Sequence, residues 1–113
     1  MAAIQFIPGI DETVVPGIQL SRAVDESSGK ARFRFEGALS MEKMAAGQEI
    51  TGMFLLDEEG ELVTRTVEMK FVNGQATALE ALYIMNSPEE WDRFMRFMER
   101  YAAENGLEFA KAK

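Results

Sequence analysis

The sequence predicts an α+β fold, in which an antiparallel β-meander of about five to six strands is covered on one face by a C-terminal amphipathic helix. Three observations lead to this prediction. Residues 87–106 carry the start, the apolar stripe and the stop of a helix. Residues 30–36 alternate between apolar and charged side chains, and Asn73-Gly74 separates two strand-like runs. Because an apolar helix stripe of this size needs a surface to cover, we expect the helix to lie across the sheet.

The helix is expected over residues of about 88–105. Ser87 is a favourable N-cap, Pro88 fits the first helical position, and Glu90 completes a capping box. Asn105-Gly106 provides a left-handed stop. The apolar stripe consists of Trp91, Phe94, Met95, Met98, Tyr101 and Ala102, at the spacing of one helix face.

The strands are predicted from period-two alternation and from turn signals. Asn73-Gly74 indicates a tight hairpin, because both turn positions need positive φ. This makes Gln75–Met85 a return strand, although its Ala-Leu-Glu content favours a helix. The expected strands are Ala3–Ile7, Ile18–Val24, Lys30–Glu36, Glu49–Leu56, Glu61–Phe71 and Gln75–Met85, and a short helical turn is expected within residues 37–47.

Composition predicts a single domain over residues 1–113 and excludes several kinds of site. The chain contains no His and no Cys, which excludes Ser-His-Asp and Cys-His catalysis and the usual zinc sites. We therefore expect no catalytic residues, no cofactor and no metal. The net charge of −7 argues against nucleic-acid binding. We expect no membrane span and no signal peptide.

The acidic run Asp57, Glu58, Glu59 and Glu61 is interpreted as a solvent-exposed hairpin turn. A calcium-binding EF-hand loop would need alternating ligands, a glycine at its sixth position and a terminal glutamate, and that pattern is missing. Charge runs of this kind are usually solvated.

Two basic groups are candidates for binding a partner. Lys30, Arg32 and Arg34, with Phe33 between them, lie on a strand expected at a sheet edge, where the charges either protect the edge or help it to accept an acidic partner strand. Arg93, Arg96 and Arg100 follow one side of the helix. They form either a docking patch or a solvated face, since each has a carboxylate four residues away on the helix.

Several segments resemble the photosystem II reaction centre protein 28 family, whose members are photosystem II assembly factors. These segments are IQFIPGI (Ile4–Ile10), FRFE (Phe33–Glu36), EITGMFLLDEEGELVTR (Glu49–Arg65), KFVNG (Lys70–Gly74) and SPEEWDRFMRFMERYAAENGL (Ser87–Leu107). The resemblance covers nearly the whole chain, apart from residues 38–48. The lack of a transit peptide is similar to a cyanobacterial member, or to a plastid-encoded or mature form.

The resemblance implies a non-catalytic, extrinsic protein at the cytoplasmic (stromal) face of the thylakoid membrane. Such a protein is peripheral at the membrane through protein contacts. It binds photosystem II assembly intermediates near the larger chlorophyll-binding core antenna protein, and it protects or reshapes the immature complex. The family suggests no catalytic residue, pigment or metal to carry over to this chain.

Two alternatives of other classes stay open at this point. The acid-rich composition permits a small carboxylate-based or cation-dependent enzyme. An open β edge also permits a self-associating interaction protein, for example a homodimer.

Overall fold

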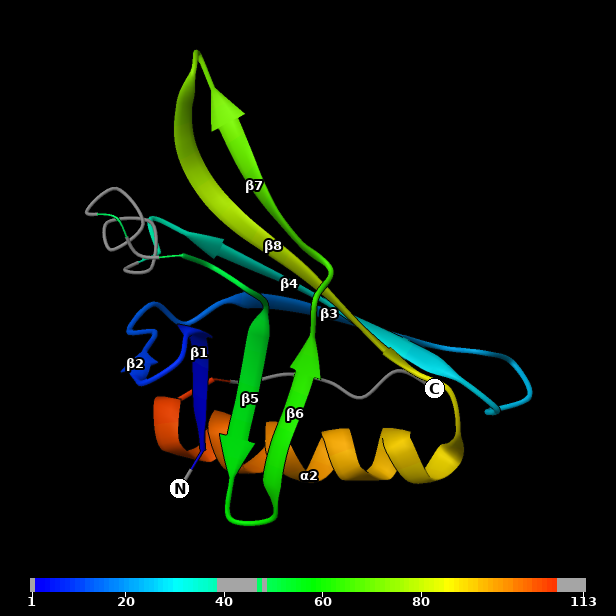
Figure 1. Cartoon of the computed structure of the whole chain (residues 1–113). Helices are drawn as coiled ribbons and strands as arrows, with labels where there is room; N and C mark the ends of the chain where they lie inside the picture. Colours follow the sequence, from blue (N-terminus) through cyan, green and yellow to red (C-terminus); the bar gives the residue numbers. More distant parts are fainter. Residues whose placement is uncertain (1, 39–46, 48, 108–113) are drawn as a thin grey trace.

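The computed structural model describes residues 2–38, 47 and 49–107, which form two four-stranded antiparallel sheets and one helix (Figure 1). The first sheet has the order β2-β1-β5-β6 and the second has the order β3-β4-β8-β7. The strands are β1 (Ala3–Ile7), β2 (Ile10–Asp11), β3 (Gly17–Arg22), β4 (Gly29–Glu36), β5 (Met53–Asp57), β6 (Gly60–Thr64), β7 (Val67–Val72) and β8 (Gln75–Met85), and the helix is α2 (Pro88–Asn105). The predicted α+β class is confirmed, whereas the single meander sheet is wrong.

The predicted strand Glu61–Phe71 is two strands. β6 ends at Thr64 and β7 begins at Val67, so the chain leaves the first sheet and enters the second at Arg65 and Thr66. Hydrogen bonds join β8 to this crossing: the Thr64 hydroxyl donates to the Leu82 carbonyl at 2.7 Å, and the Leu82 N–H donates to the Thr66 carbonyl at 3.0 Å. One continuous alternation in the sequence therefore serves two different sheets.

The helix caps are those that the sequence predicts. The Ser87 side chain accepts the Glu90 N–H, and Gly106 ends the helix with φ 66°. The Glu90 carboxylate also accepts a backbone N–H, although from Asn86 at 3.1 Å rather than from the N-cap residue. In Figure 1 the helix runs crosswise to β1, β5 and β6.

The core lies where the two sheets and the helix meet. Phe35 of β4 packs edge-on against Phe6 of β1, with ring centres 4.9 Å apart, and Phe33 of β4 packs edge-on against Phe94 of the helix at 6.1 Å. The predicted stripe of the helix is buried, together with Phe97, which the stripe did not include. β4 is thus the strand on which all three layers converge.

The hairpin of β7 and β8 projects beyond this core (Figure 1). Asn73 and Gly74 form its turn with φ of 52° and 79°, as the sequence predicts. Near the turn Phe71 is 61% exposed and Val72 is 58% exposed. The helical turn expected within residues 37–47 falls almost wholly outside the described residues.

Candidate functional site

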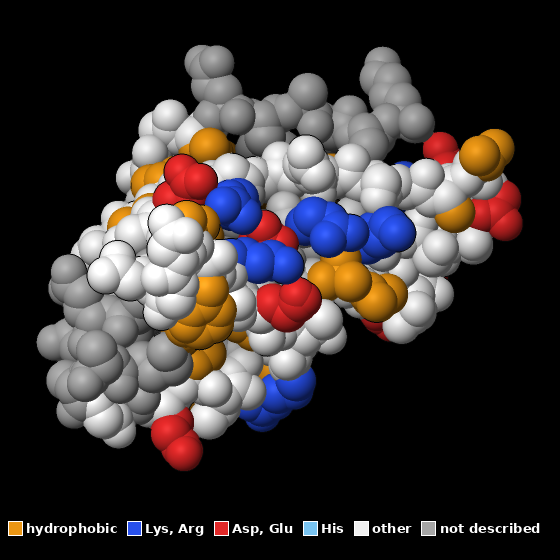
Figure 2. Space-filling view, turned by 90° about the horizontal axis from the view of Figure 1, so that it is seen from above, with side chains coloured by type: hydrophobic (Ala, Val, Ile, Leu, Met, Phe, Trp, Pro, Cys, Tyr) orange, Lys and Arg blue, Asp and Glu red, His pale blue; other side chains and the backbone are white. Residues whose placement is uncertain are grey.

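The outer face of the β3-β4-β8-β7 sheet carries the basic residues that the sequence singles out. β4 alternates strictly: Ala31, Phe33 and Phe35 are buried, whereas the residues between them are exposed. A strand places successive side chains on opposite faces, so Lys30, Arg32 and Arg34 share the outer face. Seen from above, several basic side chains lie close together, beside acidic and hydrophobic ones (Figure 2).

One part of this face neutralises its own charges. Arg34 hydrogen-bonds to Glu80 of β8 and, at 3.3 Å, to Glu36. The Lys70 ammonium lies 3.2 Å from the Glu68 carboxylate and 3.7 Å from the Glu80 carboxylate. The hydrogen bond to Glu80 raises the pKa of Arg34, with a smaller contribution from Glu36. These four partners leave little net charge for a ligand.

Lys30 and Arg32 differ, because neither has an ion-pair or hydrogen-bond partner within the part of the chain that the structure describes. In the sheet register Lys30 lies opposite Ile84 of β8, and Arg32 lies opposite Leu82. Ile84 is 51% exposed. We call these four residues, Lys30, Arg32, Leu82 and Ile84, the cationic patch. It combines two unpaired charges with aliphatic surface, on a chain whose net charge is −7.

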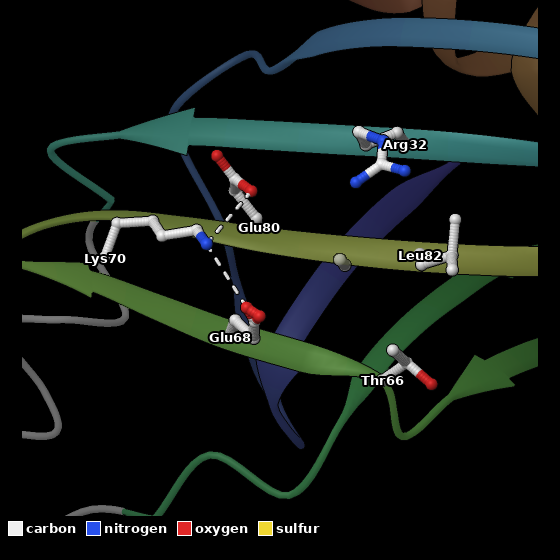
Figure 3. Close-up of a pocket in the computed structure, with 7 residues that line it drawn as sticks. Arg32, Thr66, Glu68, Lys70, Glu80 and Leu82 are labelled. Carbon is white, nitrogen blue, oxygen red and sulfur yellow. Dashed lines mark hydrogen bonds and ion pairs between the residues drawn. The ribbon is translucent and has the colours of Figure 1, made fainter.

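Shallow hollows lie on both sides of Arg32. Figure 3 shows the first, with Lys70 between Glu68 and Glu80, and with Arg32 on the neighbouring strand. Its volume is about 210 Å³, and its lining also includes Thr66, Ala81 and Leu82. The second hollow is lined by Lys30 and Arg32 together with Gln19, Leu20 and Ser21 of β3. The cationic patch can therefore hold a carboxylate between polar walls.

The strand that carries these cations is not a sheet edge, as the sequence analysis had it. β4 pairs with β3 over Gly29–Arg34 and with β8 over Gly29–Glu36, so its backbone is occupied on both sides. The outer strands of this sheet are β3 and β7. Phe33, also predicted to bind a partner, has no exposed surface and packs in the core. A partner can reach the cations from the face or from the β3 side.

The helix arginines bind carboxylates of the β5–β6 turn, rather than the helix carboxylates that the sequence suggests. Arg93 donates two hydrogen bonds to Asp57, at 3.0 and 2.7 Å, and Arg100 donates to the same carboxylate at 2.8 Å. Arg96 donates two bonds of 2.8 Å to Glu59. The acidic run is thus not simply a solvated turn, since the Asp57 side chain has no exposed surface.

The electrostatics of this turn follow from the ion pairs. Burial raises the pKa of Asp57, but the hydrogen bonds from Arg93 and Arg100 outweigh it, so the pKa lies below its ordinary value. Hydrogen bonds from Arg96 and Arg100 lower the pKa of Glu59 to about 2. The three arginines thus fasten the turn to the helix, which leaves Lys30 and Arg32 as the basic residues with free donors on the sheet face.

Leu82 and Ile84 were not predicted as site residues. Their signal was present in Gln75–Met85, where every second residue after Glu80 falls on the face opposite the core. The propensity of this segment for helix hid that alternation. No group of three or more acidic side chains suited to a metal ion occurs in the described ranges, and no helix there is long and apolar enough to cross a membrane.

Comparison with known proteins gives the family. The model of the family described as Psb28 protein matches residues 4–109. The Photosystem II reaction center Psb28 protein of Crocosphaera subtropica is 58% identical over 112 residues, which cover 99% of this chain and 100% of that protein. The Photosystem II assembly factor Psb28 protein of Thermosynechococcus vestitus is 56% identical over 113 residues, which cover 100% and 96%. A relative of the red alga Pyropia yezoensis is 55% identical over 113 residues, which cover 99% and 98%. The chain therefore belongs to the Psb28 family.

Proposed function

We propose that this protein is a photosystem II assembly factor that binds immature complexes without catalysing a reaction. The names of its relatives support the association with photosystem II and the role in assembly. The sequence lacks the His and Cys residues on which much catalysis depends. The buried or bonded carboxylates of the β5–β6 turn are held by arginines, which makes them poor candidates for acid–base work.

We further propose where it acts. The protein is peripheral at the cytoplasmic (stromal) side of the thylakoid membrane and contacts photosystem II core subunits near the larger core antenna protein. There it protects or reshapes the immature complex. This finer assignment rests on the family resemblance together with the basic face of the sheet.

The cationic patch is the observation that carries the docking proposal. A chain with seven excess negative charges keeps two cations unpaired on one sheet face, beside the outer strand β3. An acidic segment of the partner can add to the β3 edge through backbone hydrogen bonds while its carboxylates reach Lys30 and Arg32. Leu82 and Ile84 then contribute apolar contact. Arg34 has a supporting role, because its guanidinium is already bound to Glu80.

The test is co-purification of tagged protein from a photosynthetic cell, with two double variants of equal charge change. K30Q/R32Q removes the unpaired cations, and R34Q/K70Q removes two cations that are already neutralised on the same face. We expect the first variant to recover much less photosystem II core protein than the second, and the loss to mimic the effect of high salt on the wild type.

Two results would overturn these proposals separately. Recovery of wild-type protein without any photosystem II subunit contradicts the assembly function. Equal recovery by the two double variants leaves that function standing and contradicts the cationic patch as the docking surface.

A further inference from the structure

The outer edge of β7, on the opposite side of the same sheet, carries a self-complementary pattern. β7 pairs with β8 on one side only, and no described strand pairs with its other side. Figure 1 shows β7 as the outer strand of the projecting hairpin. We propose that this edge binds the β7 edge of a second copy of the chain, antiparallel and centred on Met69.

The backbone directions of β7 permit this pairing. The Thr66 carbonyl accepts the Leu82 N–H at 3.0 Å, so the backbone groups of Thr66 point toward β8. Backbone groups of an antiparallel strand alternate between its two neighbours. Glu68 therefore also points toward β8, and Met69 points away from it. Two Met69 residues related by a two-fold axis can exchange both N–H···O bonds.

Charge selects this register over the next one. With Met69 opposite Met69 of the second copy, Glu68 lies opposite Lys70 of the second copy, and the same pair occurs again by symmetry. These are non-hydrogen-bonded positions, where facing side chains come closest. A register centred on Glu68 would instead place two glutamates opposite each other, and directly opposed like charges destabilise a sheet.

The apolar residues of the strand agree with this register. It brings Phe71 of each copy beside Val67 of the other, and Phe71 is 61% exposed in the single chain. The irregular register between Lys70 and Phe71 keeps the paired segment short. Because a six-residue edge buries far less surface than a standard stable interface, we expect a weak dimer that depends on protein concentration.

The test uses charge complementation between two variants. E68K and K70E each place like charges opposite each other in a homodimer, so each variant alone should stay monomeric in sedimentation at concentrations where the wild type dimerises. Mixed together, the two variants restore both opposite-charge pairs, and we expect a one-to-one heterodimer. K30E, a charge reversal on β4 of the same face, should dimerise like the wild type.

The outcomes decide the proposal in either direction. Association of the mixture, with neither variant associating alone, supports the Met69-centred register. A wild type that stays monomeric over the whole concentration range overturns it, as does a mixture that does not associate. Trp91 is buried, so an unchanged emission maximum of its fluorescence shows that each variant keeps its fold. The proposal is independent of the docking function, which uses the face and the β3 side of the sheet.

Discussion

Single buried charges hold the helix to the β5–β6 turn. The Asp57 carboxylate is fully buried and accepts hydrogen bonds from Arg93 and Arg100. In Asp57→Asn these two guanidinium groups lose their anionic partner in a largely dry environment. We expect the free energy of unfolding to fall by about 2–4 kcal/mol, as measured by urea denaturation.

Glu58 offers a matched control for this prediction. It lies next in the chain, its side chain is 68% exposed, and it approaches the Arg100 guanidinium only at 3.4 Å. Glu58→Gln removes the same charge from the same turn and should change the denaturation midpoint very little. Equal losses in the two variants would contradict a specific role for the buried carboxylate.

The neighbouring Glu59 predicts how stability depends on acid. Its pKa is lowered from 4.5 to about 2 by hydrogen bonds from Arg96 and Arg100. Because the folded pKa is the lower one, Glu59 stabilises the fold fully above pH 4.5, and this contribution disappears as the pH falls through about 2. Thermal melts should show Glu59→Gln less stable than the wild type at pH 7 and equal to it near pH 2. A difference that persists at pH 2 would contradict this reasoning.

At this scale the sequence revealed faces rather than partners. The alternation of Lys30–Glu36 correctly separated the buried Phe33 and Phe35 from the exposed cations. The ion pairs of the helix arginines were predicted wrongly, because spacing along the chain indicates only neighbours on the same helix. Asp57 and Arg93 are 36 residues apart and meet only when the β5–β6 hairpin packs on the helix.

At the scale of elements, Gly29 shows how closely the helix approaches β4. A Cβ atom at this position would lie 2.3 Å from the Trp91 ring, and that ring also carries the Arg22 guanidinium 4.8 Å from its centre. Gly29→Ala must displace the first turns of the helix or the tryptophan itself. We expect a loss of about 1–3 kcal/mol in the free energy of unfolding, with a changed near-ultraviolet circular dichroism signal from Trp91.

Gly17→Ala is the control for this substitution. Gly17 begins β3 in the same sheet, and a Cβ atom there meets nothing within 4 Å. The control should therefore leave both stability and the tryptophan signal nearly unchanged. A Gly29→Ala variant that behaves like the control would show that the helix tolerates a wider spacing from β4.

The elements themselves were predicted well where local chemistry decides them. The caps at Ser87 and Gly106 and the turn at Asn73-Gly74 need only nearby residues, and all three are confirmed. The division of Glu61–Phe71 was missed, because the chain stays extended as it passes from β6 to β7. What changes at Arg65 is the neighbouring strand, and a pairing partner is not encoded in a period-two pattern.

At the scale of the whole molecule, the two sheets share one core, but the second sheet extends beyond it. β4 is paired on both sides, and its Phe33 and Phe35 are completely buried. The far half of the β7–β8 hairpin has no such cover, because Gln75, Ala76 and Thr77 are all exposed. The sequence could not show this division, since the same alternation continues through both halves of β8.

Hydrogen exchange should therefore separate the hairpin tip from the body. Amides of β4 can exchange only when the shared core opens, which requires most of the global free energy of unfolding. Amides near Asn73 need only local fraying, so we expect them to exchange at least about a thousandfold faster. The measurement belongs at low protein concentration, where pairing of the β7 edge between copies cannot protect Met69. Equal protection of the tip and β4 would mean that hairpin and body open as one cooperative unit, and the exposed Phe71 would then lie on a rigid extension of the core.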